Sequence, residues 1–170
     1  MMEEHGHRAD AAAKGAPRMM GLDFGAKTVG VAVSDPLGMT AQPLETIVRE
    51  REDKLRRTLA RIEELIRAYN VGTLVLGLPK NMDNRIGARA EKTIAFQETL
   101  RRRTGLPVVL WDERLTTAQA RRVLEEAGIA GQKHKQYLDA MAAALILESY
   151  MSAENAAGTG DGRTAEENVE

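Results

Sequence analysis

The sequence contains no cysteine among its 170 residues. This absence excludes disulfide bonds, thiolate metal sites and cysteine nucleophiles, so any chemistry must use carboxylates, hydroxyls or the three histidines. Disulfides belong to oxidising compartments, and their absence fits a cytoplasmic protein. We therefore expect a cytoplasmic location and oxygen- or nitrogen-based chemistry.

Long apolar runs, aromatic residues and net charge are also scarce. No segment approaches the roughly 20 apolar residues of a membrane span, and the N-terminus offers no apolar signal core. Aromatic residues make up 4% of the chain, so base stacking should not dominate any nucleic-acid recognition. Lys plus Arg number 24 against 25 for Asp plus Glu, so any basic surface must be local.

The length favours one domain, which we place at residues 18–151. Residues 1–17 are small and polar, and residues 152–170 are acidic and rich in glycine, so both are predicted to be disordered tails. His5 and His7 resemble a metal pair, but a tail without further ligands favours a solvated segment.

Apolar patterning predicts an α/β protein with five strands and four helices. The helix over 50–69 is the clearest, because apolar residues recur on one helical face. Strands are expected at 18–24, 29–34, 41–48, 73–78 and 107–111, and helices at 50–69, 85–103, 117–127 and 133–151. Three leading strands followed by alternating helices and strands predict a mixed sheet, antiparallel on one side and parallel on the other, flanked by helices.

Asp23 is an acid within an apolar strand, where an unpaired charge is costly to bury. It could instead accept hydrogen bonds from backbone N–H groups in the following turn. Asp112 and Glu113 directly follow a buried strand, the position where α/β sheets gather ligands, although such acids also cap helices.

Asp139 interrupts the small and apolar face of the last predicted helix. An acid on a packing face needs a partner, and a salt bridge to Lys or Arg is the ordinary alternative. The small residues around it would bring the helix close to the sheet, and Asp139 close to the first strand.

Three converging acids would repel one another unless they were protonated or shared cations. Mg²⁺ prefers carboxylate and water oxygens, and two ions about 4 Å apart can activate water and stabilise a leaving oxygen. Metal-assisted phosphodiester hydrolysis is the reaction that this arrangement suits.

Four motifs in order are recognisable in combination: LDFGAKTVGVAVSD at 22–35, GLPKNMD at 77–83, WDERLTT at 111–117 and DAMAA at 139–143. Together they closely resemble the bacterial family of Holliday-junction-resolvase-like proteins, also described as pre-16S rRNA nucleases. The similarity runs from about Arg18 to Met151. At one position the sequence departs from the family, with Asn84 where Gly is usual, and Asn tolerates the left-handed conformation of such a turn.

The resemblance implies a ribonuclease H-like fold, dependence on Mg²⁺ or Mn²⁺, and maturation of the 5′ end of small-subunit ribosomal RNA. By motif, the catalytic and metal-binding acids carry over to Asp23, Glu113 and Asp139, with Asp112 held in reserve for the second position. Two ions are expected.

Basic and polar residues beside the motifs are candidates for holding nucleic acid through its phosphates. They are Lys27, Lys80, Asn81, Arg89, Arg114, Lys133 and Lys135. For each charged side chain the alternative is an ordinary solvated residue, and Arg101–Arg103 suit a helix C-terminus.

Other functions remain open on sequence alone. Sugar kinases and actin-like ATPases also begin with an Asp-x-Gly turn, but they repeat the fold in two lobes and this chain shows no second copy. A non-catalytic ribosome-biogenesis or transcription factor is a third class. Within the nuclease interpretation, the substrate is an rRNA precursor or branched DNA, and the protein is a monomer or a homodimer.

Overall fold

The computed structural model describes residues 15–80, 86–115, 122, 126 and 135–161. Its strands are β1 (Arg18–Phe24), β2 (Thr28–Ser34), β3 (Ala41–Val48), β4 (Val71–Leu78) and β5 (Val108–Asp112). Its helices are α2 (Arg56–Tyr69), α3 (Ala88–Thr104) and α5 (Lys135–Asp161), with a short 3-10 turn, η1, at Glu113–Leu115. Of the helix predicted over 117–127 only residues 122 and 126 are described, both as helical, and the N-terminal segment 1–14 lies outside the described residues.

The five strands form one mixed sheet in the order β3-β2-β1-β4-β5. The β1–β2 and β2–β3 pairs are antiparallel, whereas β1–β4 and β4–β5 are parallel. This arrangement confirms the sheet that the sequence predicted. It also places the carboxyl ends of β1, β4 and β5 at one edge, where ligands gather in α/β sheets.

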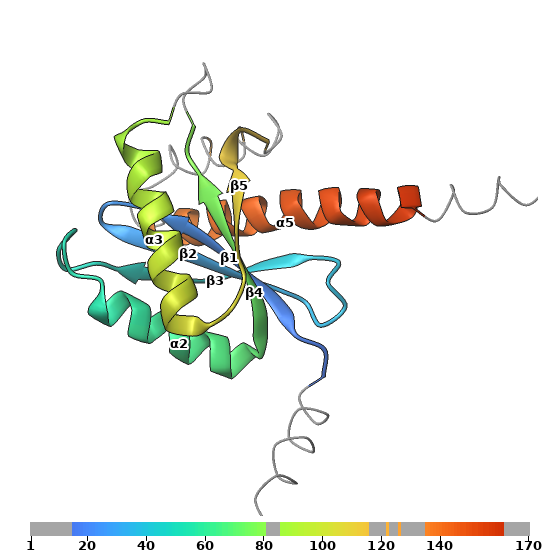
Figure 1. The fold of residues 1–170 in the computed structure, drawn as a ribbon, viewed down its shortest axis with the longest axis horizontal. Helices are drawn as coiled ribbons and strands as arrows, with labels where there is room; N and C mark the ends of the chain where they lie inside the picture. Colours follow the sequence, from blue (N-terminus) through green and yellow to red (C-terminus); the bar gives the residue numbers. More distant parts are fainter. Residues whose placement is uncertain (1–14, 81–85, 116–121, 123–125, 127–134, 162–170) are drawn as a thin grey trace, which may run out of the picture.

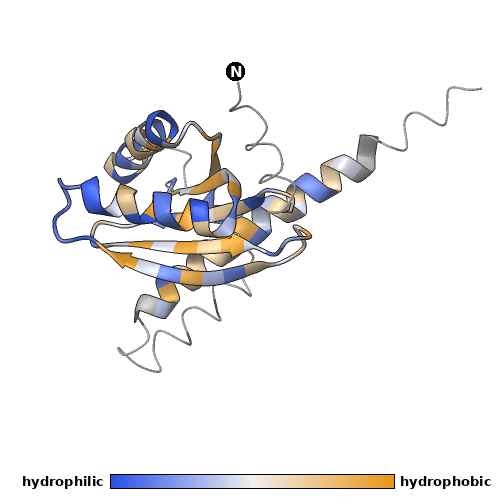
Figure 2. Cartoon of the chain, turned by 90° about the horizontal axis from the view of Figure 1, so that it is seen from below, coloured by the Kyte–Doolittle hydropathy of each residue, from blue (hydrophilic) through white to orange (hydrophobic). Residues whose placement is uncertain are grey.

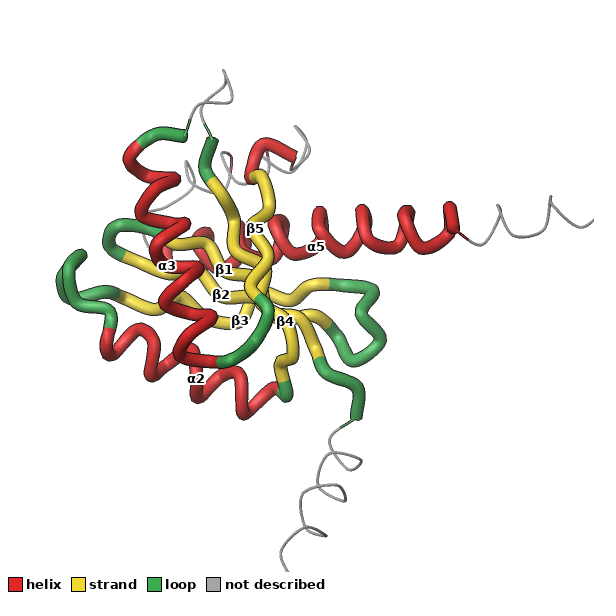
Figure 3. Tube along the Cα trace, in the orientation of Figure 1, coloured by secondary structure: helices red, strands yellow, loops and turns green. Residues whose placement is uncertain are grey.

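Helices cover both faces of the sheet (Figures 1 and 3). On one face, α2 and α3 bury Leu59, Ile62 and Phe96 against the strands. On the other, α5 packs Ala143 and Leu147 onto β1, β2 and β3. Figure 2 shows that hydrophobic residues concentrate in the strands between these helical layers.

The structure corrects two helix boundaries. α2 begins at Arg56 rather than at residue 50, because the preceding residues form the loop after β3. α5 continues past Met151 to Asp161, through part of the stretch predicted to be a tail. Side chains 152–158 are exposed, so this extension reflects the helix propensity of its Ala and Glu residues rather than packing. No described helix is long and apolar enough to cross a membrane.

Candidate active site

Asp23 lies near the carboxyl end of β1 and pairs with Gly30 of β2. Residues paired across strands share a face of the sheet, so Asp23 and Gly30 both face α5. A Cβ at Gly30 would collide with the Asp139 backbone carbonyl, and one at Gly21 would lie 2.6 Å from the Ala143 carbonyl. Glycine on these strands therefore lets α5 approach the sheet closely and brings Asp139 over β2.

Asp139 is held in place by a hydroxyl from the sheet. Thr28 Oγ1 donates a 2.9 Å hydrogen bond to Asp139 Oδ2, joining the start of β2 to the second turn of α5. The negative charge of Asp139 also acts on Asp23 and raises its pKa. The described partner of Asp139 is thus a hydroxyl, rather than the Lys or Arg of an ordinary salt bridge.

Glu113 reaches the same place from the end of β5. A Cβ at Gly77 would lie 2.8 Å from Glu113 Oε1, so the absence of a side chain on β4 leaves room for this carboxylate. The side chains of Asp23 and Glu113 share a hydrogen bond. Strands β1 and β5 therefore bring two acids into direct contact across β4.

Both acids have raised pKa values. Burial raises the pKa of Asp23, and the charge of Asp139 adds to the effect. Burial and the charge of Asp23 raise the pKa of Glu113 to about 7. A hydrogen bond between two carboxyl groups requires a proton, so without metal the pair holds a shared proton near neutral pH.

The carboxylates of Asp23, Glu113 and Asp139 supply hard oxygen atoms, which suit Mg²⁺ or Mn²⁺. Among the described residues, however, no three acidic or histidine side chains are already grouped as the ligands of one ion. Asp23 and Glu113 share a hydrogen bond, and the charge of Asp139 acts on Asp23. A cation held between Asp23 and Glu113 would take the place of the proton that they share.

Asp112, the reserve candidate, has a different partner. Arg114 Nη2 lies 2.7 Å from Asp112 Oδ2, and the Arg114 backbone N–H donates to Asp112 Oδ1. These hydrogen bonds lower the pKa of Asp112, and the charge of Lys80 lowers it further. Asp112 is the last residue of β5, whereas Glu113 begins the 3-10 turn and lies against Gly77 of β4. The geometry therefore brings Glu113, and not Asp112, into contact with Asp23.

Several predicted nucleic-acid contacts lie at the same sheet edge as the acids. Arg89 Nη2 donates to the Phe24 carbonyl, and its positive charge lowers the pKa of both Asp23 and Glu113. Lys27 is exposed in the β1–β2 turn, and Lys80 follows β4. Arg114 is engaged with Asp112. Asn81 and Lys133 lie outside the described residues, and of Lys135 only its place at the start of α5 is described.

The sequence did not identify Arg49, which stabilises the turn after Asp23 through hydrogen bonds. Its backbone N–H donates to the Lys27 carbonyl, and its guanidinium donates to the Gly25 carbonyl and lies 4.6 Å from the centre of the Phe24 ring. Nothing in the local sequence distinguishes Arg49 from its charged neighbours. The sequence gives a clearer indication of Thr28 and of the glycines as site residues, because they interrupt apolar strands beside the acids.

Comparison with known proteins finds relatives that match most of this chain. A family model described as "RuvX: Holliday junction resolvase" matches residues 17–153. A relative from Lachnospira eligens, named "Putative pre-16S rRNA nuclease", is 58% identical over 134 residues, covering 79% of this chain and 96% of the relative. A Listeria monocytogenes protein of the same name is 53% identical over 138 residues, covering 81% and 99%.

A solved structure shares the fold at much lower identity. The chain is similar to RuvC from T. thermophilus in complex with a Holliday junction substrate, with a TM-score of 0.55 and 18% sequence identity. The similarity covers 82% of this chain and 97% of RuvC. The sheet order and this likeness together confirm the predicted ribonuclease H-like fold.

Proposed function

The chain belongs to the RuvX family of Holliday junction resolvases, and on that premise we propose that it is a nuclease that hydrolyses phosphodiester bonds with Asp23, Glu113 and Asp139. The observation that carries this proposal is the contact between Asp23 and Glu113 beside the charge of Asp139. Acids kept together at the carboxyl ends of strands, despite their repulsion, are typical of a site that binds cations.

The residues have separable roles in this proposal. Asp23, Glu113 and Asp139 would hold Mg²⁺ or Mn²⁺, and Thr28 keeps Asp139 oriented by its hydrogen bond. When bound, a pair of such ions activates water and stabilises the leaving oxygen. Arg89 offsets the negative charge of the acids, while Lys27 and Lys80 stand where they can contact backbone phosphates.

We propose a ribosomal RNA precursor as the substrate, cut at the 5′ end of the pre-16S RNA. Relatives that carry the pre-16S rRNA nuclease name match nearly their whole length to this chain. Such a role would place the protein in the cytoplasm, where bacterial ribosomes are assembled. Contacts through phosphates and helix shape, rather than through a base sequence, suit a structured RNA.

Four-way DNA junctions are the second candidate substrate. The family description names this activity, and the fold neighbour RuvC is in complex with such a junction. Resolution of a junction needs two cuts and hence two active sites, which a homodimer supplies and a monomer does not. The oligomeric state measured with and without junction DNA therefore bears on this candidate.

A cleavage assay with both substrates tests the proposal. Purified protein is incubated with precursor rRNA and, separately, with a four-way junction, in Mg²⁺, in Mn²⁺ and with a chelator. We expect metal-dependent cleavage of the RNA at a defined position and none with the chelator. Binding of both substrates without cleavage in either metal would instead support a non-catalytic binding protein.

A further inference from the structure

Three carbonyl groups at the turn between β1 and β2 accept hydrogen bonds from two arginine residues. Arg89 Nη2 donates to the Phe24 carbonyl. Arg49 donates to the Gly25 carbonyl through its guanidinium and to the Lys27 carbonyl through its backbone N–H. These contacts fix the direction of the peptide groups that directly follow the first acid.

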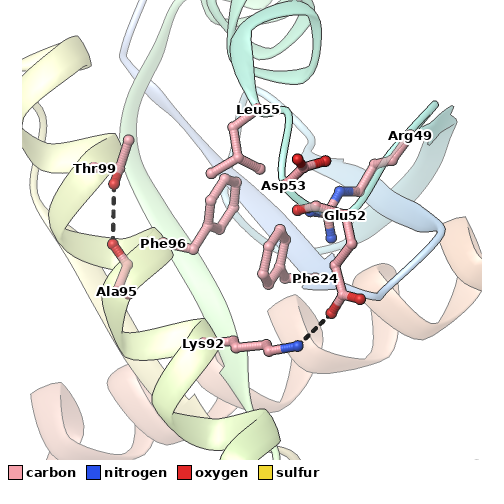
Figure 4. A pocket seen from close by; sticks show the side chains of 9 residues that line it. All are labelled: Phe24, Arg49, Glu52, Asp53, Leu55, Lys92, Ala95, Phe96 and Thr99. Atoms are coloured by element: carbon pink, nitrogen blue, oxygen red, sulfur yellow. Dashed lines mark hydrogen bonds and ion pairs between the residues drawn. The ribbon is translucent and has the colours of Figure 1, made fainter.

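Arg49 holds this turn from the sheet face opposite α5. It is buried, and its guanidinium lies 4.6 Å from the centre of the Phe24 ring (Figure 4). A second hydrogen bond, to the Glu52 carbonyl, joins Arg49 to the loop after β3. Lys92 Nζ lies 2.5 Å from Glu52 Oε1, so α3 is linked to the same loop. The turn is therefore supported by both β3 and α3.

The same turn presents backbone N–H groups that can bind a ligand. Ala26 and Lys27 are exposed, and their N–H groups have no hydrogen-bond partner among the described residues. The C=O and N–H groups of a trans peptide point in opposite directions, so the Ala26 N–H points away from the Gly25 carbonyl and from Arg49. Backbone N–H groups at a turn suit an anion.

Arg89 places a positive charge beside these N–H groups. It lies in the first turn of α3 and is partly buried. Its Nη2 atom would lie 3.7 Å from a Cβ at Gly25, so the guanidinium stands next to the turn. The other guanidinium nitrogens have no hydrogen-bond partner among the described residues. They offer the planar donor fork that fits two oxygens of one phosphate.

The turn is close enough to the acids to contact the same strand of substrate. Gly25 is two residues from Asp23, so their Cα atoms are at most about 7 Å apart. The charge of Arg89 acts on both Asp23 and Glu113, which also indicates that its guanidinium is near them. Successive phosphates of an extended strand are separated by a similar distance. A phosphate at the turn therefore adjoins a phosphate at the acids.

We propose that Arg89 and the N–H groups of Ala26 and Lys27 bind the phosphate that adjoins the one that is cut. Contacts to phosphates position a strand without reading its bases. Binding at the turn would hold the strand so that the next phosphate lies at Asp23 and Glu113. The inference rests on the proposed nuclease function and deepens it, because it assigns the groups that place the substrate.

Binding of a dinucleotide tests the phosphate site without requiring catalysis or metal. The full chain, with a chelator, is titrated with thymidylyl-thymidine, which carries one phosphodiester, and followed by NMR. The control ligand is its methylphosphonate analogue, which has the same bases and sugars but no charge. The phosphodiester should shift the amide signals of Ala26 and Lys27, and the analogue should not. Equal shifts with both ligands, or none with either, overturn the proposal.

Loss of one charge on α3 tests the part played by Arg89. Arg89→Gln should weaken dinucleotide binding by about tenfold, as expected for a hydrogen bond between charged groups. Arg101→Gln is the matched control, because it removes an exposed charge about 18 Å further along the same helix and should leave binding unchanged. Binding by folded Arg89→Gln that equals wild type would contradict the assignment.

A proline tests the part played by the backbone. Ala26→Pro removes the N–H group and should also weaken binding of the dinucleotide by about tenfold. Ala26→Gly keeps the N–H group and should bind like wild type. If Ala26→Pro does not fold, the shift of the Ala26 amide signal in wild type decides the same contact. Full binding by a folded proline variant would overturn the role of the turn.

A scan of the substrate then identifies the phosphate. Single methylphosphonates are placed around the cut, each next to a 2′-deoxynucleotide that prevents attack by the 2′-hydroxyl. Wild-type kcat/KM should fall by about tenfold at the phosphate adjoining the cut, and Arg89→Gln should lose no more there. An equal loss in both proteins at that phosphate overturns the assignment to Arg89. If no substrate is cut at all, the nuclease function fails while the titration still decides the phosphate site.

Discussion

Thr28 Oγ1 donates a 2.9 Å hydrogen bond to Asp139 Oδ2 across 111 residues of sequence. This bond fixes a carboxylate of α5 above the turn that follows Asp23. It links the antiparallel hairpin, which carries the first acid, to the last helix, which carries the third. The orientation of Asp139 in the candidate site thus depends on the hydroxyl of Thr28.

Thr28→Val should therefore weaken metal binding while keeping the side-chain shape. Groups that orient metal ligands contribute about 10- to 100-fold to metal affinity, so a loss near the lower limit is expected for one neutral hydrogen bond. The free energy of unfolding should fall by about 1 kcal/mol. Thr28→Ser, which keeps the hydroxyl, is the control. Calorimetric titration with Mn²⁺ that finds equal affinity in all three proteins would refute the role assigned to Thr28.

Gly30→Ala should separate α5 from the sheet. The added Cβ would collide with the Asp139 carbonyl, which is backbone and cannot rotate away. Overpacking of this kind costs about 1 to 3 kcal/mol of unfolding free energy, and Asp139 should be displaced with its helix. Gly158→Ala is the matched control, because nothing surrounds Gly158 in α5 and alanine there should stabilise the helix by up to about 1 kcal/mol. Chemical denaturation measures both effects, and a Gly30→Ala protein as stable as wild type would contradict the packing argument.

Stability without metal should fall as pH rises towards neutrality. The pKa of Glu113 is raised from its ordinary value of 4.5 to about 7. Because folding raises this pKa, protonated Glu113 stabilises the folded protein. This stabilisation is fully present below pH 4.5 and is lost as pH rises through about 7. The loss attributable to Glu113 should be on the order of 3 kcal/mol.

Denaturation of metal-free protein between pH 4.5 and 8 measures this loss. Glu113→Gln cannot titrate and should show a flatter dependence over the same range. Mg²⁺ binds the deprotonated site, so it should restore stability at the upper end of the range in wild type. A stability that rises with pH in wild type relative to Glu113→Gln would contradict the raised pKa.

Glu113→Gln should lower the rate of cleavage far more than Asp112→Asn. Asp112 is paired with Arg114, whereas Glu113 contacts Asp23. Replacing Glu113 should lower kcat by more than about 100-fold, since even the loss of groups that support metal ligands costs 10- to 100-fold. Asp112→Asn should retain most of the activity. The reverse ranking in a single-turnover assay would move the second ligand to Asp112.

The sequence predicted the sheet well because its strands are short apolar runs bounded by turns and proline. β4, for example, is buried on both faces, and its run of apolar residues is unbroken from Leu74 to Leu76. The predicted end of the last helix, at Met151, was wrong. The Ala and Glu residues after Met151 extend the helix to Asp161 without an apolar pattern that would reveal it.

The candidate site was predictable only in part. Asp23 and Asp139 stand out as acids on apolar surfaces, but the choice between Asp112 and Glu113 depends on the 3-10 turn after β5 and on the Arg114 pair. Arg49 could not be identified, because its burial results from the packing of Phe24 and the loop after β3. Such long-range contacts leave no periodic trace in the sequence.

Cleavage by Asp23→Asn tests the central claim most directly. The amide nearly keeps the shape of the carboxylate but removes the charge that holds a hard cation. With precursor rRNA and saturating Mg²⁺, this variant should lose more than about 100-fold in cleavage rate while still binding RNA through its basic residues. Glu148→Gln, at an exposed position of α5, should cleave like wild type. Equal cleavage by Asp23→Asn and wild type, with contaminating nuclease excluded, would contradict the assignment of Asp23 as an essential metal ligand.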